Sequence, residues 1–255
     1  MESKSLEPVI SFRNVHISFG TGDVLCGANL DIYKNQTTAL IGASGAGKSV
    51  LVRSVIGLEK PQKGEILFHG VNVIGKSEEE FLAVRKKVAY AFQFGALFDS
   101  FTVLDNLAYP LREHTDLSET EIREKVLGTL KVLGLEGTEG LFPANLSGGM
   151  QKRVGLARAI ILGPEVILYD EPTSGLDPFN TRNINELINR LKGMGHTGVM
   201  ITHDMASAFT CADRIAMLYG GKIAFSGSTE EVKNSDNDIV RGFITGKLLK
   251  GQILG

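Results

Sequence analysis

The feature that most constrains the fold of this chain is a glycine-rich loop between two apolar runs. The loop reads GASGAGKS over residues 42–49. The run before it, residues 38–41, is short and apolar, as in a strand buried in a parallel sheet. The run after it, residues 50–56, has the composition of a helix. A chain with this order is expected to place the loop between the carboxyl end of a buried strand and the amino end of a helix.

The residue types in this loop suit the binding of a polyphosphate. Glycines permit tight turns that point backbone N–H groups at an anion. Lys48 supplies a positive charge for phosphates, and the Ser49 hydroxyl can ligate Mg²⁺. The alternative, a glycine-rich turn with an accidental Lys–Ser pair, is disfavoured by the strand-like and helix-like flanks. The predicted nucleotide-binding residues are Gly42, Ala43, Ser44, Gly45, Ala46, Gly47, Lys48, Ser49 and Val50.

Strand-like and helix-like runs alternate along the 255 residues, which predicts an α/β fold. We expect a P-loop NTPase core with a mainly parallel central sheet, a peripheral antiparallel sheet and an inserted α-helical subdomain. The expected ATPase domain covers residues 8–235, the subdomain about residues 94–163, and a short C-terminal tail residues 236–255. Core strands are expected at 87–93, 166–171 and 198–204, peripheral strands at 9–19 and 64–73, and a hairpin at 214–227 that turns at Gly220 and Gly221.

The clearest helix of the insert lies within residues 117–134. Ser118 and Glu121 have the spacing of a capping box, and Gly134 is placed to end the helix. One face is apolar and predicts a buried side, formed by Ile122, Val126, Leu130 and Leu133. The apolar stretch 240–254 near the C-terminus is expected to form a short packing helix.

Composition narrows the classes of partner. Lys and Arg total 27 against 29 Asp and Glu, so the net charge of −2 offers no general attraction for nucleic acid. No apolar run approaches the ~20 residues that span a bilayer, and residues 1–8 lack the apolar core of a signal peptide. The two cysteines, Cys26 and Cys211, are expected to be small core residues rather than a disulfide or metal site. These features predict a soluble protein that faces the cytosol.

A second anion-binding pattern follows about a hundred residues after the first, in the letters NLSGGMQKRVGLARAI. Ser147 is a natural N-cap for a helix over residues 150–161, and helix N-termini attract anions. Because the chain already has one phosphate-binding loop, we expect this second one to serve a nucleotide held by another copy of the chain. An ordinary Ser-capped helix is the alternative.

Taken together, these motifs resemble the ATP-binding-cassette ATPases over roughly residues 9–232. The letters LSGGMQ are similar to the signature motif of that family, and VILYDEPTSGLDP resembles its Walker B strand and D-loop. The resemblance implies ATP as ligand, with signature residues that act on the partner's nucleotide. These signature residues are Leu146, Ser147, Gly148, Gly149, Met150 and Gln151, and the D-loop residues are Ser174, Gly175, Leu176 and Asp177.

The same resemblance assigns roles to single residues. It implies that Glu171 polarises the attacking water, His203 is the switch histidine, Gln93 is the Q-loop glutamine and Lys48 neutralises phosphate charge. The implied Mg²⁺ residues are Ser49, Gln93 and Asp170, and Phe19 is placed to stack on adenine. Alternatives remain for three of them: a solvated charge for Glu171, a structural histidine for His203, and edge-strand packing for Phe19.

An ATPase of this family without membrane spans commonly serves a separate membrane permease. After the Q-loop, Phe94, Leu97 and Phe98 form an apolar cluster, expected to be the groove for a helix of that permease. The alternative is that these side chains pack the core of the subdomain. The stretch GALF followed by NLAYPLREHT resembles the ATPase subunit of Mla-type phospholipid-transport complexes, which work with MCE proteins.

The resemblance therefore implies a peripheral ATPase at the cytoplasmic face of the inner membrane. Its implied partners are a second ATPase copy, an integral permease and an MCE-domain protein, with no nucleic acid. Two other functions stay open: the ATPase of a small-solute or amino-acid importer, and the soluble ATPase of an iron–sulfur assembly scaffold.

Overall fold

A six-stranded, mainly parallel sheet forms the centre of the computed structural model, which describes residues 7–20, 22–93 and 95–246. Adjacent strands pair in parallel except for β10, which runs antiparallel to β9. The strand order is β10 (Lys222–Ser228), β9 (Arg214–Tyr219), β3 (Thr37–Ile41), β8 (Thr197–Ile201), β7 (Val166–Asp170) and β6 (Val88–Ala91). The predicted hairpin turn at Gly220 and Gly221 is confirmed.

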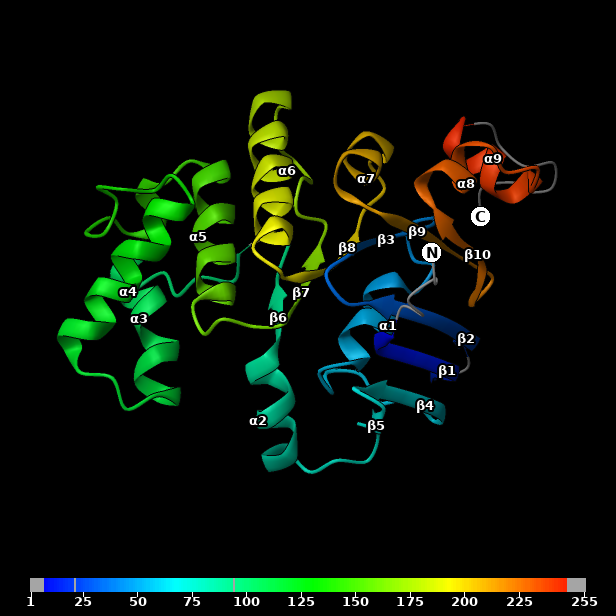
Figure 1. Ribbon diagram of the computed structural model, residues 1–255, viewed down its shortest axis with the longest axis horizontal. Coiled ribbons are helices and arrows are strands. Elements are labelled where there is room, and N and C mark those ends of the chain that lie inside the picture. The colour runs from blue at the N-terminus through cyan, green and yellow to red at the C-terminus, as the bar shows by residue number, and fades with distance from the viewer. Residues whose placement is uncertain (1–6, 21, 94, 247–255) are drawn as a thin grey trace, which may run out of the picture.

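A four-stranded antiparallel sheet lies beside the central sheet, as predicted. Its order is β2 (Gly22–Tyr33), β1 (Pro8–Phe19), β4 (Lys63–Phe68) and β5 (Val71–Asn72). Figure 1 shows this sheet with the helices α1 (Lys48–Ser54) and α2 (Glu78–Lys87) on one side of the central sheet. On the other side lie α6 (Pro178–Gly193) and α7 (Met205–Cys211).

Alternating strand residues explain this layering, because successive side chains of a strand point to opposite faces. In β7, Val166 and Leu168 belong to the hydrophobic cluster shared with β1, β2, α1 and α2. Ile167 and Tyr169 belong to the other cluster, which continues through α6 and α7. Burial on both faces accounts for the continuous apolar runs that identify these strands in the sequence.

The helical insert lies at one side of the core (Figure 1) and consists of α3 (Val103–His114), α4 (Glu119–Val132), the 3-10 turn η1 (Pro143–Asn145) and α5 (Gly148–Ile160). The capping box of Ser118 and Glu121 is confirmed, and Gly134, the residue after the C-cap of α4, has a positive φ of 62°. The predicted apolar face of α4 is buried. Helix α5 begins at Gly148 rather than at the expected Met150, because Ser147 accepts a hydrogen bond from the Met150 N–H and draws both glycines into the first turn.

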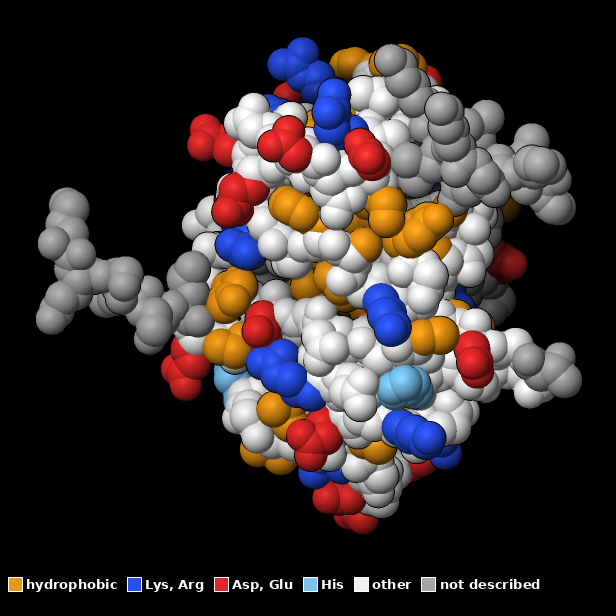
Figure 2. Space-filling view, turned by 90° about the vertical axis from the view of Figure 1, so that its right-hand side faces the viewer, with side chains coloured by type: hydrophobic (Ala, Val, Ile, Leu, Met, Phe, Trp, Pro, Cys, Tyr) orange, Lys and Arg blue, Asp and Glu red, His pale blue; other side chains and the backbone are white. Residues whose placement is uncertain are grey.

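The C-terminal part adds the short helices α8 (Thr229–Lys233) and α9 (Asp238–Ile244). Val240 of α9 is buried, and Phe243 and Ile244 pack against the same cluster as α6, which confirms a short packing helix there. Its predicted continuation beyond residue 246 lies outside the described residues. None of the described helices is both long and apolar enough to cross a membrane. Figure 2 shows acidic and basic side chains interspersed on the face turned to the viewer.

The segment after β6 packs directly on α5 through two glycines. A Cβ atom added to Gly155 would lie 2.4 Å from Cα of Gly95, closer than real Cβ contacts allow. The guanidinium of Arg158, one turn further along α5, donates a hydrogen bond to the carbonyl of Ala96 at 2.6 Å. This close approach fixes the Q-loop on the helix that begins with the signature motif.

We expect Gly155→Ala to lower the free energy of unfolding by about 1–3 kcal/mol, because the added methyl group must displace the Gly95 backbone. Gly128→Ala is the matched control. Gly128 lies inside α4 with open space around its Cα, so the substitution should stabilise the helix by roughly 0.5–1 kcal/mol. Urea unfolding of both variants checks the opposite signs. Equal effects would show that the Gly95–Gly155 contact carries no packing constraint.

Candidate functional site

The glycine-rich loop joins β3 to α1 and forms one wall of a cavity of about 490 Å³. Gly42 has φ 149°, and a Cβ atom there would lie 2.4 Å from the carbonyl oxygen of Leu218. Gly47 has φ 97° and is the N-cap of α1, with no side chain capping the helix. Only glycine meets both demands, of conformation and of space. The loop therefore leaves backbone N–H groups of the first turn of α1 open to an anion.

Lys48 lies inside this loop. Its ammonium group donates hydrogen bonds to the carbonyl oxygens of Gly42 and Ala43, both at 2.9 Å. Burial lowers the pKa of Lys48, and the charges of Glu171 and Asp170 oppose this shift. The cation is therefore held where a phosphate in the loop would meet it, close enough to the carboxylates of Glu171 and Asp170 to interact with their charge.

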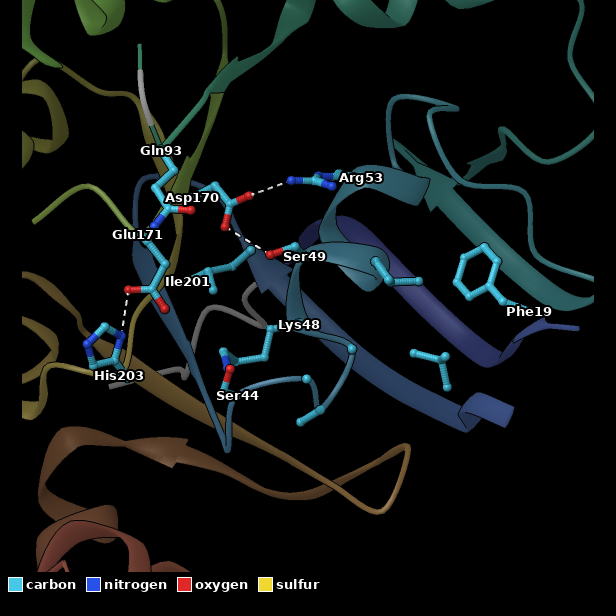
Figure 3. A pocket seen from close by; sticks show the side chains of 15 residues that line it. Phe19, Ser44, Lys48, Ser49, Arg53, Gln93, Asp170, Glu171, Ile201 and His203 are labelled. Carbon is cyan, nitrogen blue, oxygen red and sulfur yellow. Dashed lines mark hydrogen bonds and ion pairs between the residues drawn. The ribbon is translucent and has the colours of Figure 1, made fainter. Parts of the chain in front are cut away.

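Asp170, at the end of β7, is 4% exposed and has hydrogen bonds on both carboxylate oxygens. Ser49 Oγ donates to Oδ1 at 2.9 Å. Arg53 donates to Oδ2 at 3.1 Å, and the Tyr90 hydroxyl donates to the same oxygen. Burial and the bond to Asp170 raise the pKa of Tyr90, and the bond to Tyr90 raises the pKa of Arg53. Figure 3 shows the interactions of Asp170 with Ser49 and with Arg53 as dashed lines.

Glu171 follows Asp170 and directs its side chain toward His203 (Figure 3). Nδ1 of His203 lies 2.9 Å from Oε2 of Glu171. This contact is an ion pair when His203 is protonated, but it does not have the geometry of a hydrogen bond. No residue in the described ranges donates a hydrogen bond to this buried oxygen. The side chain of Glu171 is 16% exposed and that of His203 is 67% exposed. A buried carboxylate oxygen with free acceptor capacity, beside an exposed imidazole, is suited to orient a water molecule.

Gln93 and Phe19 complete the predicted set around the cavity. Gln93 lines it and donates from Nε2 to Ser174 Oγ at 3.4 Å. Phe19, at the end of β1, is 51% exposed and lies at the opposite end of the cavity from Glu171 and His203. Figure 3 shows this separation, with Lys48 and Ser49 between the two ends.

The signature residues lie elsewhere. No residue from 146 to 151 is among the described residues that line the cavity. Leu146 and Gly149 are buried, whereas Ser147 and Gly148 are exposed at the start of α5. Gln151 donates to the carbonyls of Pro143 and Leu146 and so fixes the entry to the helix. Within one chain, the structure thus brings together the loop, Gln93, Asp170, Glu171, His203 and Phe19, but not the signature residues.

The D-loop connects the turn that begins at Glu171 to α6. Gly175 has φ 72°, and Leu176 packs partly on the core. Asp177 is the N-cap of α6 and accepts a hydrogen bond from the Asn180 N–H at 2.9 Å. This bond lowers the pKa of Asp177. The D-loop is therefore held at both ends, by Asp177 on α6 and by Ser174 beside Gln93.

Two residues that donate hydrogen bonds to Asp170, Arg53 and Tyr90, escape prediction from the sequence; of the two, Arg53 lines the cavity. Arg53 lies one helical turn after Ser49, so the spacing i, i+4 could have placed it near Asp170. Tyr90 has no such signal, because its contact with Asp170 depends on β6 lying next to β7 in the sheet. Val24 and Ile201 also line the cavity without a motif of their own.

Of the three residues predicted for the permease groove, Phe98 lies on a surface of aromatic side chains that it forms with Phe101 and Tyr109. Phe98 is 44% exposed, and the ring centroids of Phe98 and Tyr109 are 5.4 Å apart. Arg158 lies over the Phe98 ring at 5.3 Å. Leu97 is half-buried against the core of the helical insert. Phe94 lies outside the described residues.

The family profile described as "ABC transporter" matches residues 25–174. The chain is 41% identical over 239 residues to the probable ribonucleotide transport ATP-binding protein mkl of Mycobacterium leprae, covering 93% of this chain and 69% of that protein. It spans 64% of the length of the mkl protein of Mycobacterium tuberculosis.

Two further proteins match over nearly their whole length. The chain is 38% identical over 240 residues to the intermembrane phospholipid transport system ATP-binding protein MlaF of Haemophilus influenzae, covering 94% of this chain and 91% of that protein. The ATP-binding cassette MJ0796, solved as a dimer bound to ADP and Pi, matches with a TM-score of 0.79 and 31% identity. That match covers 86% of this chain and 98% of the other.

These matches confirm the predicted P-loop NTPase fold class, and the profile covers the loop, the signature motif and the Walker B carboxylates together. The chain belongs to the ABC transporter family and is an ATP-binding, ATP-hydrolysing cassette of that family.

Proposed function

We propose that two copies of this chain bind two ATP molecules in a head-to-tail dimer and power a membrane permease that moves phospholipid. The observation that supports this most is the position of the signature residues. Ser147 and Gly148 are exposed at a capped helix N-terminus, yet lie outside the cavity that holds Lys48 and Glu171. A second copy would bring these two features together, and the solved MJ0796 cassette is itself dimeric.

Within this proposal, the residues of one chain divide the work. The loop from Gly42 to Val50, of which residues 44–50 line the cavity, would bind the phosphates with Lys48 supplying charge, and Phe19 would stack on adenine. Glu171 would orient the attacking water, and His203 would sense the γ-phosphate beside it. Ser147, Gly148 and Gly149 of the second copy would close the site, while the D-loop would link the two sites.

Mg²⁺ would bind next to Ser49, Gln93 and Asp170. The site fits this ion because Ser49 and Asp170 place oxygen atoms 2.9 Å apart at the cavity wall. No cluster of three or more His, Cys, Asp or Glu side chains with metal-binding geometry occurs in the described part of the chain. A Mg²⁺ ion that keeps several waters and phosphate oxygens needs only one or two protein ligands. When bound, it would neutralise phosphate charge.

The permease is proposed to dock on the aromatic surface of Phe98, Phe101 and Tyr109. Exposed aromatic rings are typical anchors in protein contacts. These residues follow the Q-loop, so a docked helix would move with Gln93 and the site. The chain would then act as a peripheral subunit at the cytoplasmic face of the inner membrane, with an MCE-domain lipid-binding protein as a further component.

The phospholipid assignment rests on the similarity to MlaF, whose name specifies phospholipid transport between membranes. The mkl proteins, named for ribonucleotide transport, match at slightly higher identity but over less of their own length. Reconstitution of the chain with its co-purifying permease, followed by ATP-dependent transfer of labelled phospholipid, discriminates between these substrates. Transfer of a nucleotide or amino acid instead would contradict the lipid assignment.

We expect Phe98→Asp to abolish co-purification with the permease while ATP affinity of the isolated chain changes less than about twofold. The carboxylate would be desolvated in the contact at a cost of a few kcal/mol, and Phe98 is exposed enough for the fold to tolerate the change. Met194→Asp, another exposed apolar position outside the aromatic surface, is the control and should retain the complex. If Phe98→Asp also retains the complex, the permease docks elsewhere.

A further inference from the structure

Lys152 is a second lysine, after Lys48, that lies close to Glu171. It lies beside the turn formed by residues 171–174. It lies in α5, five residues after the helix-capping Ser147, and its side chain crosses to the loop after β7. The ammonium group donates hydrogen bonds to the carbonyl oxygens of Glu171 at 3.5 Å, Pro172 at 3.3 Å and Ser174. All three acceptors belong to one four-residue turn. Three donors of one ammonium group are thereby matched to three carbonyls.

The turn that Lys152 holds is strained at Glu171. This residue has φ 50°, a left-handed conformation that is unusual for a residue other than glycine. Such a conformation persists only where the surroundings over-determine it. Two backbone bonds contribute: the Glu171 N–H donates to Ile201 at 3.0 Å, and the Ser174 N–H donates to Glu171 at 3.2 Å. Lys152 reaches this turn from the helical insert through its hydrogen bonds to Glu171, Pro172 and Ser174.

The charges around Lys152 support a role in positioning Glu171. Burial lowers the pKa of Lys152, whereas the charge of Glu171 raises it. The cation is close enough to Glu171 to feel its charge, but its hydrogen bonds go to the backbone rather than to the carboxylate. The carboxylate keeps its acceptor capacity for water, and the backbone beneath it is fixed.

We propose that Lys152 is a positioning residue for Glu171 of its own chain. It holds the backbone of residues 171–174 so that the carboxylate points into the cavity. This inference rests on the proposed role of Glu171 in the dimer. Because α5 begins with the signature residues, Lys152 also links the two ATP sites of the dimer. It connects the helix that would contact the partner's ATP to the turn that carries Glu171, which acts on the ATP of the same chain. Movement of that helix when the partner's site closes would reach Glu171 through this contact.

The first test compares turnover and ATP affinity of Lys152 variants in the full complex. We expect Lys152→Met to lower kcat on the order of 10- to 100-fold, because a misplaced catalytic group loses alignment. KM should stay within about twofold, and Lys152→Arg, which keeps several donors, should restore most of kcat. Thermal unfolding shows that each variant is folded. Lys152→Gln replaces Lys152→Met if the latter does not fold.

Arg153→Met is the matched control. Arg153 is the next residue of α5 and donates to the carbonyls of Leu133 and Gly134 at the end of α4, away from Glu171. The Arg153→Met variant should lose about as much stability as Lys152→Met, but it should keep the kcat of the unmodified chain. If Arg153→Met and Lys152→Met lower kcat equally, the contact acts only through the stability of the insert and the inference is wrong.

A double-mutant cycle separates this inference from the proposed function. In the Glu171→Gln background, Lys152→Met should have no further effect on single-turnover hydrolysis, because it acts through the missing carboxylate. Additive losses would overturn the inference. If Glu171→Gln abolishes turnover but Lys152→Met does not lower it, the proposed function stands and only the role of Lys152 fails. If Glu171→Gln retains turnover, the proposed function itself fails.

Mixed dimers with one Glu171→Gln chain show on which chain Lys152 acts. With Lys152→Met placed in the chain that keeps Glu171, activity should fall relative to the mixed dimer without it. With Lys152→Met placed in the Glu171→Gln chain, activity should stay at that reference. The reverse pattern would mean that Lys152 serves the partner's nucleotide through the signature helix, and would contradict a role within its own chain.

Discussion

Glu171→Gln should lower the ATP turnover of the complex by roughly 100- to 10,000-fold, the range expected for loss of a general base. The amide keeps the size of the side chain but cannot accept a proton from water. The loop and Lys48 lie on another part of the cavity wall, so ATP affinity should stay within about twofold. Turnover by phosphate release and affinity by equilibrium binding of labelled ATP give the two measurements.

Glu186→Gln is the control for this result. Glu186 is an exposed carboxylate on α6 that pairs with Arg182, outside the cavity. It should leave turnover unchanged. Near-normal turnover in purified Glu171→Gln complex would mean that another group orients the water and that the assignment of Glu171 is wrong.

Lys48→Ala should weaken ATP binding and turnover together. The lysine is buried in the loop, where its charge meets the phosphates at low dielectric, and a hydrogen bond to a charged group contributes about 2 kcal/mol. Affinity for ATP should therefore fall by roughly 30-fold. Turnover at saturating ATP should fall as well, because charge on the transferring phosphoryl group loses its counter-ion.

The control for this charge deletion is Lys222→Ala, which removes an exposed lysine at the start of β10. The ATP affinity and the turnover of Lys222→Ala should equal those of the unmodified chain. An unchanged ATP affinity in Lys48→Ala would contradict the placement of phosphate in the glycine-rich loop.

Local patterns predict much of this fold because the core strands are buried on both faces. The strands containing Ala39, Ile167 and Met200 are buried throughout, and they end at or directly before Gly42, Asp170 and the approach to His203. In a parallel sheet, carboxyl ends lie at one edge, so the residues that follow these strands gather in one cavity. Strand order itself still requires the structure, since the sequence does not say that β3 lies between β8 and β9.

Contacts that depend on packing between distant elements could not be predicted. Tyr90 reaches Asp170 only because β6 and β7 are neighbours, and Lys152 reaches Glu171 only because α5 packs over the same edge. Strand β2 is missing from the sequence prediction, although Ala28, Leu30 and Ile32 alternate with the polar residues Asn29 and Asp31 in the pattern of a half-buried strand. Helix α5 begins two residues earlier than expected because the Ser147 cap places Gly148 and Gly149 in the first helical turn.

Cross-linking between two chains tests the shared ATP site most directly. One chain would carry Ser44→Cys and the other Ser147→Cys, both with Glu171→Gln to retain ATP and with Cys26→Ser and Cys211→Ala to remove the native thiols. Ser44 lines the cavity and Ser147 caps α5, so a cross-link between the two chains reports the head-to-tail arrangement. We predict a cross-linked dimer with a short bifunctional reagent in the presence of ATP and little without it. Absence of that product with ATP, in chains shown to bind the nucleotide, would contradict a site built from two copies.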